Sequence, residues 1–351
     1  EQFVKRNFPE PSTLYADTTG RGTAWYKQTM NILLDMRLSA DLKVDPAYLM
    51  DIPELKPDAE DIATYNAIIK RMSEAQRNRY KEIYAERGKL IQEKKLLGKE
   101  LLKYKYQWYM QDYLGTIAAV DENVGRVLDY LEENGLMENT IIVYTSDQGF
   151  YLGEHGWYDK RFIYDESFKT PLLVAWPGRT KPGSRSDALV QNLDFAQTFL
   201  EAAGVKSPND MQGESLIPLL TGTTEKWTRD AVYYHYYEYP AEHMVNRHYA
   251  IVTKEYKLIH YYFVEDQWEL IDRVKDPQEL KNVYNDPAYV TVKKDLHTRL
   301  DALRVKYKDS SEISQGYINR LLDDAAKGKV WGVSKERFEV ILERRKKVES
   351  R

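Results

Sequence analysis

The residues best suited to chemistry lie in one short stretch, from Ser146 to Lys160. Asp147 and Gln148 follow an unbroken apolar run, so we expect them at the carboxyl end of a buried strand, where open α/β sheets place ligands. A carboxylate beside an amide carbonyl offers two of the hard oxygens that Ca²⁺ or Mg²⁺ prefers, although a full shell needs six or more. Lys160 adds a point charge suited to a tetrahedral oxyanion.

Two interpretations of this stretch are open from residue spacing alone. It is either half of a site for a divalent cation and a small anion, or a turn-capping Asp followed by a surface Lys, because motifs this short also match by chance. Gly149, Gly153 and Gly156 suit close backbone approach in a loop that turns over an anion. His155 lies in that loop, where its ring could contact an anion or fix the loop by a hydrogen bond.

A second candidate site lies between residues 235 and 248, where His, Glu and Arg alternate with Tyr. The His and Glu spacings fit no tight metal-ligand pattern. One interpretation is a sugar-binding site, in which His243, Arg247 and His248 bind polar or charged groups of a substrate and Tyr rings face the sugar. The alternative is a half-exposed sheet face, where Tyr is common.

The composition restricts the classes of function. Of 351 residues, 51 are Lys or Arg and 55 are Asp or Glu, which gives a net charge of −4. Nucleic acid and membrane surfaces are therefore not expected as partners, because both favour a basic excess. The chain has no Cys, which excludes disulfides, thiolate metal sites and Cys nucleophiles within these residues.

The helices and strands that would position these residues are predicted from the periodicity of apolar residues and from the Gly and Pro residues that end such elements. An apolar stripe over residues 113–131 predicts a helix that ends near Gly135. The apolar runs 140–144 and 171–176 predict strands, the first of them buried on both faces in the middle of a sheet, and 192–203 predicts a helix. This order is typical of an α/β fold.

The flanking regions have a different character. Residues 1–58 contain five prolines and are expected to form a surface connection, and residues 61–97 a solvated helix. Short Tyr-rich runs between 230 and 272 predict a small antiparallel sheet, followed by a helix over 288–306. The tail from 308 to 351 has two helix candidates, the second beginning near Ser334.

The stretch from Ser146 to Gly178 resembles the second half of a sulfatase of the alkaline phosphatase superfamily. It has the family's Ser-Asp-(Asn/Gln/His)-Gly strand end, a Gly-Glu-His-Gly loop, a Lys thirteen positions after the Asp, and a Pro-Leu-Leu-Val strand. The resemblance covers about residues 104–306 and is strongest to bacterial glycosaminoglycan sulfatases of the N-acetylglucosamine-6-sulfatase type.

This resemblance implies an alkaline-phosphatase-like α/β sandwich whose amino half is missing, with a small carboxyl-terminal α+β subdomain. The implied boundaries are 1–222 for the α/β part with a long helical connection, 227–306 for the antiparallel-sheet subdomain, and 307–351 for a helical tail. Because relatives that act on polysaccharides are exported, the resemblance also implies a periplasmic or secreted protein.

The activity implied by the resemblance is that of a sulfuric ester hydrolase, which removes sulfate from a glycosaminoglycan hexosamine. In such enzymes a hydrated formylglycine, made from Cys or Ser, attacks the sulfur, while Ca²⁺ and basic side chains neutralise the sulfate oxygens. By position, Asp147 and Gln148 resemble the metal ligands, with Ca²⁺ favoured over Mg²⁺. Lys160 resembles the catalytic Lys that binds a sulfate oxygen, and His155 lies in the matching loop.

The chain departs from the family in lacking its amino-half motifs, above all a Cys/Ser-x-Pro-x-Arg nucleophile. We therefore expect the amino-terminal half of the same enzyme as a partner and no sulfatase activity from these residues alone. One alternative is an inactive carbohydrate-binding or assembly protein on a sulfatase scaffold. Another is a phosphodiesterase or phosphonate hydrolase, although Gln148, in place of His, favours a single Ca²⁺ over two transition metals.

Overall fold

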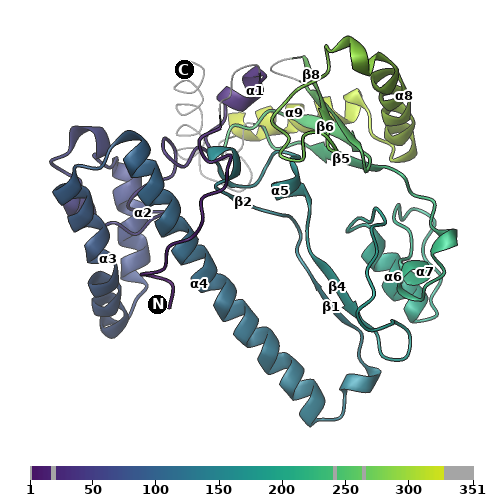
Figure 1. The fold of residues 1–351 in the computed structure, drawn as a ribbon, viewed down its shortest axis with the longest axis horizontal. Coiled ribbons are helices and arrows are strands. Elements are labelled where there is room, and N and C mark those ends of the chain that lie inside the picture. Colours follow the sequence, from purple (N-terminus) through teal and green to yellow (C-terminus); the bar gives the residue numbers. More distant parts are fainter. Residues whose placement is uncertain (1, 17–20, 240–242, 263–265, 328–351) are drawn as a thin grey trace. The chain divides into compact units, whose positions relative to one another are not determined.

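The computed structural model describes residues 2–16, 21–239, 243–262 and 266–327 (Figure 1). They divide into two compact units, each built from separated segments. The described parts of residues 1–16, 30–136 and 151–159 form the first unit, and those of 17–29, 137–150 and 160–351 form the second. This partition differs from the expected continuous domains 1–222, 227–306 and 307–351, because the chain passes between the units repeatedly.

The first unit is mainly helical. Its elements are η1 (Pro46–Tyr48), η2 (Pro53–Leu55), α2 (Ala59–Lys70), α3 (Glu74–Lys94), α4 (Gly98–Glu133), β2 (Tyr151–Leu152), η4 (Glu154–Gly156) and β3 (Tyr158–Asp159). As expected, α4 ends near Gly135: its last residue is Glu133, and the Gly135 φ of 64° allows the Leu136 N–H to donate to the Leu131 carbonyl across the turn. The expected solvated helix over 61–97 is instead two helices, α2 and α3, because Ser73 starts a new helix with a capping box.

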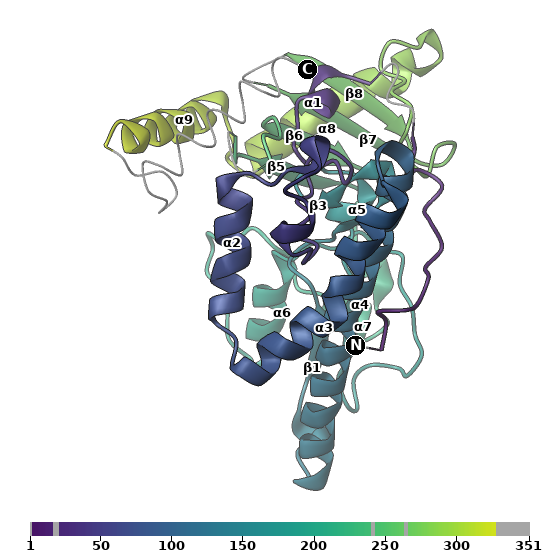
Figure 2. The same ribbon diagram turned by 90° about the vertical axis from the view of Figure 1, so that its left-hand side faces the viewer.

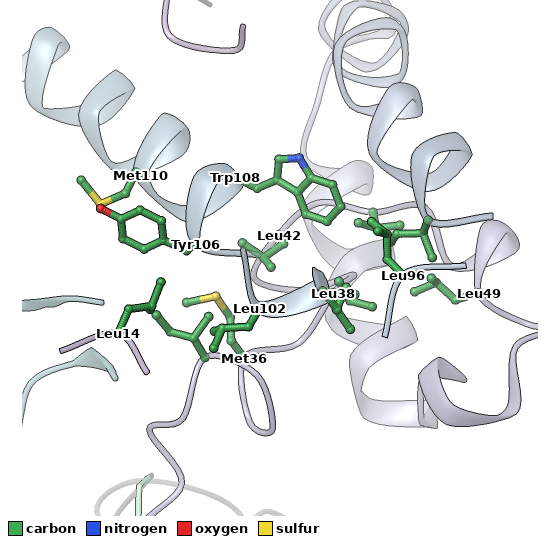
Figure 3. Close-up of a cluster of buried hydrophobic side chains, with 14 residues drawn as sticks. Leu14, Met36, Leu38, Leu42, Leu49, Leu96, Leu102, Tyr106, Trp108 and Met110 are labelled. Atoms are coloured by element: carbon green, nitrogen blue, oxygen red, sulfur yellow. The ribbon is translucent and has the colours of Figure 1, made fainter. Parts of the chain in front are cut away.

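The core of the first unit lies between α4 and the proline-rich amino-terminal segment. Ile32 and Val44 are completely buried, and Leu14 and Met36 belong to the same buried cluster as Tyr106 of α4, which Figure 3 shows. Lys105 of α4 holds the same segment, because its Nζ donates to the carbonyls of residues 32, 33 and 36 at 2.6–3.2 Å. The prediction of a surface connection over residues 1–58 is therefore wrong: this segment forms half of a core.

The second unit contains most of the strands. Its elements are α1 (Thr23–Tyr26), η3 (Met137–Asn139), β1 (Ile142–Thr145), α5 (Asp165–Phe168), β4 (Leu172–Ala175), α6 (Asp194–Ala202), α7 (Ile217–Leu220), η5 (Thr224–Lys226), β5 (Val232–Tyr236), β6 (His248–Val252), β7 (Tyr256–Tyr261), β8 (Gln267–Asp272), η6 (Pro287–Tyr289), α8 (Val290–Lys306) and α9 (Ser311–Ala326). The second predicted tail helix, near Ser334, lies outside the described residues.

Strands β1 and β4 form a two-stranded antiparallel sheet in the described part of the chain. Val143 and Val174 face an apolar hollow lined also by Phe195 and Phe199 of α6. On the opposite face Tyr144 and Leu173 are 43% and 60% exposed. The expectation of a strand covered on both faces is thus wrong for residues 2–16, 21–239, 243–262 and 266–327, which cover only one.

The predicted antiparallel sheet is confirmed, with four strands in the order β5-β6-β7-β8. Helix α8 packs against it, as Figure 2 illustrates. Leu296 and Leu300 of α8, the helix expected over 288–306, join Ile251, Leu258 and Leu270 of the sheet in one buried cluster. No helix in the described ranges is both long and apolar enough to cross a membrane.

Candidate functional site

Asp147 and Gln148 follow the end of β1, as predicted, with only Ser146 between the strand and Asp147. The Asp147 carboxylate is exposed and accepts a hydrogen bond from the Gln148 backbone N–H at 3.1 Å. The Ser146 hydroxyl donates to the Gln148 carbonyl at 2.7 Å and closes a tight turn at the strand end. The carboxylate therefore stands at the end of the β1–β4 sheet with access to solvent, where it can take a ligand.

Gly149 fixes the backbone that follows this doublet. Its N–H donates to the Ser167 carbonyl at 2.8 Å. A Cβ at Gly149 would lie 2.1 Å from the Glu166 carbonyl oxygen and 2.9 Å from that of Lys169, so any side chain would force the backbone to move. The close approach expected of this glycine is thus present, and it is made to protein backbone.

Lys160 follows β3 and is half-buried. Its two neighbours, Asp159 and Arg161, have φ values of 67° and 150°, which non-glycine residues rarely adopt. Such backbone costs about 1–3 kcal/mol per residue and persists only where surrounding contacts hold it. The segment around Lys160 is therefore held in one conformation by its contacts.

His155 belongs to the first unit, whereas Asp147, Gln148 and Lys160 belong to the second. The His155 side chain is buried against Tyr151 and Trp157, at ring-centroid distances of 6.0 and 5.3 Å. Its backbone N–H donates to the Thr13 hydroxyl at 3.1 Å, and its φ is 59°. These contacts show the His155 ring packed among aromatic rings and its backbone tied to Thr13. Both of its predicted roles, a loop-fixing hydrogen bond of the ring and contact with the substrate, stay predictions.

The three residues of the second candidate site are all buried. His243 is held by a hydrogen bond from its Nδ1 to the Thr29 carbonyl at 2.8 Å. Arg247 is 2% exposed, and its guanidinium donates to the carbonyls of Tyr239 and Ser314 at 3.0 and 3.3 Å. These contacts support the backbone around β6, and direct substrate contact by these residues stays a prediction.

His248 is the most deeply buried of the three, with no exposed surface. Its ring packs against Phe162 and Tyr236 at centroid distances of 5.9 and 5.3 Å, and its Nδ1 is 2.8 Å from the Asn246 carbonyl. Burial lowers the pKa of His248 from its ordinary 6.5 to about 3. The imidazole is therefore neutral at physiological pH and does not act as a cation towards an anionic sugar.

A polar network beside this sheet escaped the sequence analysis. The buried His235 ring lies between Asp309 and Tyr262, with Nδ1 2.6 Å from the Asp309 carboxylate and Nε2 2.5 Å from the Tyr262 hydroxyl. The hydroxyls of Tyr233 and Tyr237 also donate to Asp309. The sequence placed His235 in a cluster, but it gave no sign that Asp309, more than seventy residues further on, would be its partner.

The donors at the end of β1 fit a hard divalent cation in type but supply only part of its shell. Asp147 offers a carboxylate and Gln148 an amide oxygen, both of which suit Ca²⁺. Within the described ranges no group of three or more His, Cys, Asp or Glu side chains is close enough to hold a metal ion. Further ligands would have to come from other groups.

Known proteins resemble this chain along most of its length. The family model "Sulfatase" matches residues 67–205, and the model "N-sulphoglucosamine sulphohydrolase, C-terminal" matches residues 153–306. The N-acetylglucosamine-6-O-sulfatase of Bacteroides thetaiotaomicron is 46% identical over 310 residues, which are 88% of this chain and 54% of that protein. The arylsulfatase of Clostridium perfringens is 30% identical over 215 residues, which are 58% of this chain and 43% of that protein.

Solved structures give the same result for the fold. A structure in complex with its substrate D-glucosamine-2-N,6-O-disulfate has a TM-score of 0.82 at 45% identity and covers 88% of this chain and 62% of its own. A phosphonate monoester hydrolase of Agrobacterium radiobacter has a TM-score of 0.54 at 25% identity, over 58% of this chain and 43% of its own. The chain spans about half the length of the curated relatives it matches.

Proposed function

This chain belongs to the sulfatase family and has its alkaline-phosphatase-like fold, and we propose that the protein hydrolyses a sulfate ester on a glycosaminoglycan hexosamine. The observation that carries this proposal is 46% identity over 310 residues to an N-acetylglucosamine-6-O-sulfatase. The similarity to a structure that binds a disulfated glucosamine supports the same class of substrate.

In the proposed site Asp147 and Gln148 hold a divalent cation. Sulfatases generally use such a metal, and the oxygen donors of this doublet support Ca²⁺ over Mg²⁺, which tolerates fewer departures from octahedral geometry. When bound, the cation would act as a Lewis acid on the sulfate group. Lys160 neutralises charge on a sulfate oxygen, which lowers the energy of the more highly charged transition state.

The proposed nucleophile is a formylglycine, for which the 351 residues contain no Cys and no Ser-x-Pro-x-Arg. We therefore propose that the amino-terminal half of a sulfatase domain completes the site. Apolar side chains that are more than a third exposed support such a partner in both units. Among them are Tyr144 and Leu173 on the β1–β4 sheet, and Ile117, Val120, Val127 and Tyr130 on α4.

We also propose that the protein works in the periplasm or outside the cell. The support for this location is the proposed substrate, an extracellular polysaccharide. Fractionation of cells and detection of the protein by antibody would test the location, and recovery with the cytoplasmic fraction would contradict it.

The function is tested by sulfate release from N-acetylglucosamine-6-sulfate, measured by ion chromatography with the enzyme as its gene encodes it. N-acetylgalactosamine-4-sulfate and an aryl phosphonate monoester serve as comparison substrates. We expect the 6-sulfated glucosamine to be preferred and Lys160→Ala to lower kcat/KM by roughly 100-fold or more. Preference for the phosphonate would favour the phosphonate hydrolase function instead.

A separate assay tests the source of the nucleophile. The 351-residue chain alone, given an aryl sulfate and Ca²⁺, is expected to show no turnover above background. Turnover by these residues would contradict the need for an amino-terminal partner. Sugar binding without sulfate release by the enzyme as encoded would favour the inactive carbohydrate-binding protein.

A further inference from the structure

One short element touches both halves of the proposed site. Helix α5 follows Lys160 by a few residues, and its Ser167 is buried. The Ser167 carbonyl accepts a hydrogen bond from the Gly149 N–H at 2.8 Å. The Ser167 hydroxyl accepts one from the Arg161 N–H at 3.3 Å. Gly149 is the residue after Gln148, and Arg161 is the residue after Lys160, so Ser167 holds the backbone beside the metal ligands and the backbone beside the anion ligand.

The backbone at Gly149 packs tightly against helix α5. The space where a Cβ would stand is filled by the Glu166 carbonyl oxygen, 2.1 Å away. A displacement of α5 would therefore move the Asp147–Gln148 turn with it.

Several polar contacts hold Arg161 beside Lys160. Arg161 has a φ of 150°, and Asp159, on the other side of Lys160, has a φ of 67°. The Arg161 carbonyl accepts a hydrogen bond from the Tyr234 hydroxyl at 3.4 Å, and the Arg161 guanidinium forms an ion pair with Glu238 at 3.2 Å. Among these contacts the Ser167 hydroxyl is the one that holds the Arg161 backbone N–H, so its removal should loosen Lys160.

Helix α5 is itself firmly anchored to the carboxyl-terminal sheet. The Asp165 N–H donates to the Glu279 carboxylate at 2.6 Å, and the Asp165 side chain pairs with Arg273 at 2.7 Å. The fully buried Lys257 bridges Asp165 and Glu279 at 3.0 and 2.6 Å. These contacts fix helix α5, and with it Ser167, to the four-stranded sheet and the loop that follows it.

We propose that Ser167 is a positioning residue that sets the metal ligands and Lys160 in register, its carbonyl acting on the former and its hydroxyl on the latter. This role rests on the proposed function. The proposal predicts two separate effects. Loss of the Ser167 hydroxyl should change sulfate affinity alone, whereas a change at Gly149 should change the affinity for the metal ion.

The test measures two affinities on the chelator-stripped enzyme as its gene encodes it. Calorimetry gives the affinities for Ca²⁺ and, with Ca²⁺ saturating, for inorganic sulfate. We expect Ser167→Ala to weaken sulfate binding about three- to tenfold, the effect of one lost hydrogen bond, with Ca²⁺ affinity unchanged. Ser167→Thr, which keeps the hydroxyl, should restore sulfate affinity. Gly149→Ala should weaken Ca²⁺ binding.

Controls separate positioning from general damage. Ser184→Ala removes an exposed hydroxyl that donates to the Lys181 carbonyl at 2.7 Å and should change neither affinity. In a Lys160→Ala background, Ser167→Ala should have no further effect, because both changes act through the same ammonium group. Should Ser167→Ala fail to fold, Ser167→Cys, of similar size but a poor acceptor, replaces it.

Sulfate affinity that is unchanged in Ser167→Ala would overturn the proposal, as would equal losses of Ca²⁺ and sulfate affinity that Ser167→Thr does not restore. If the unmodified enzyme binds neither Ca²⁺ nor sulfate, the proposed function itself fails. The two failures are therefore distinguishable.

Discussion

At the scale of single residues, the second unit is held by charges buried beneath the site. Lys257 has no exposed surface, and its Nζ contacts the Glu279 carboxylate at 2.6 Å, that of Asp165 at 3.0 Å and the Ile163 carbonyl at 2.7 Å. Each charge offsets the desolvation cost of the others, so removal of any one leaves a buried charge without a partner and should destabilise the fold.

Replacement of this lysine therefore has a large expected cost. Lys257→Met leaves two carboxylates without their shared cation and should lower the free energy of unfolding by about 3–5 kcal/mol. Lys254→Met, at an exposed position, is the matched control and should change it by less than about 0.5 kcal/mol. Chemical denaturation checks both values, and a small effect of Lys257→Met would show that the buried pairs contribute little.

His248 predicts a dependence of stability on pH. Burial lowers the pKa of His248 from 6.5 to about 3. Below pH 6.5 this imidazole therefore binds a proton in the unfolded chain but not in the folded chain. The stabilising effect is complete above pH 6.5 and is lost as the pH falls towards 3, by about 1.4 kcal/mol per unit.

The measurement is the free energy of unfolding of His248→Phe and of the unmodified chain between pH 6 and pH 4. The difference between the two curves should have a slope of about 1.4 kcal/mol per pH unit. Parallel curves would mean that His248 titrates normally in the folded protein.

The sequence predicts individual residues well where a motif is local and poorly where contacts are distant. Asp147 lies near the end of β1, as the motif predicted, whereas the roles of Asp147 and Lys160 as ligands stay predictions. The sequence did not point to Ser167, because its hydrogen-bond partners are the backbone N–H groups of Gly149 and Arg161, which no side-chain pattern reveals. Arg247 and His248 were predicted to bind substrate, and this role stays a prediction. They lie just before and at the start of β6, an inner strand of the sheet, and Tyr-rich runs do not reveal which strand is central.

At the scale of elements, the β1–β4 sheet has one covered and one open face. Val174 lines the apolar hollow beneath α6, while its neighbour Leu173 is 60% exposed. Val174→Lys should therefore destabilise the chain by about 2 kcal/mol, and Leu173→Lys by less than about 0.5 kcal/mol. Thermal or chemical unfolding distinguishes the two.

The same pair tests the proposed partner. If the amino-terminal half of a sulfatase domain covers the open face, Leu173→Lys should abolish activity in the enzyme as encoded while leaving this chain folded. Full activity in Leu173→Lys would contradict a partner on that face.

Elements were predicted to different degrees. The helical stripe over 113–131, a helix end near Gly135 and a small antiparallel sheet between 230 and 272 follow from periodicity and glycine chemistry. The structure has all three, although α4 begins earlier, at Gly98. The strand at 140–144 was predicted to be covered on both faces because its residues are apolar throughout. Apolar sequence reports what a strand can bury, and here the described residues supply cover for one face only.

At the scale of the whole molecule, the resemblance to sulfatases is confirmed by two family models and by 46% identity over 310 residues. The organisation into two units was not predictable, because each unit combines segments distant in sequence. The buried proline-rich segment shows the same limit, since prolines reveal where helices stop but not what packs against the chain between them.

The central claim is that Asp147, Gln148 and Lys160 form half of a site for a divalent cation and a sulfate group. A crystal structure of the enzyme as encoded, grown with Ca²⁺ and inorganic sulfate and phased to locate calcium by its anomalous signal, tests this claim directly. The account predicts Asp147 and Gln148 oxygens about 2.3–2.6 Å from the ion and Lys160 Nζ about 3 Å from a sulfate oxygen. Calcium bound elsewhere, with these three side chains in solvent, would contradict it.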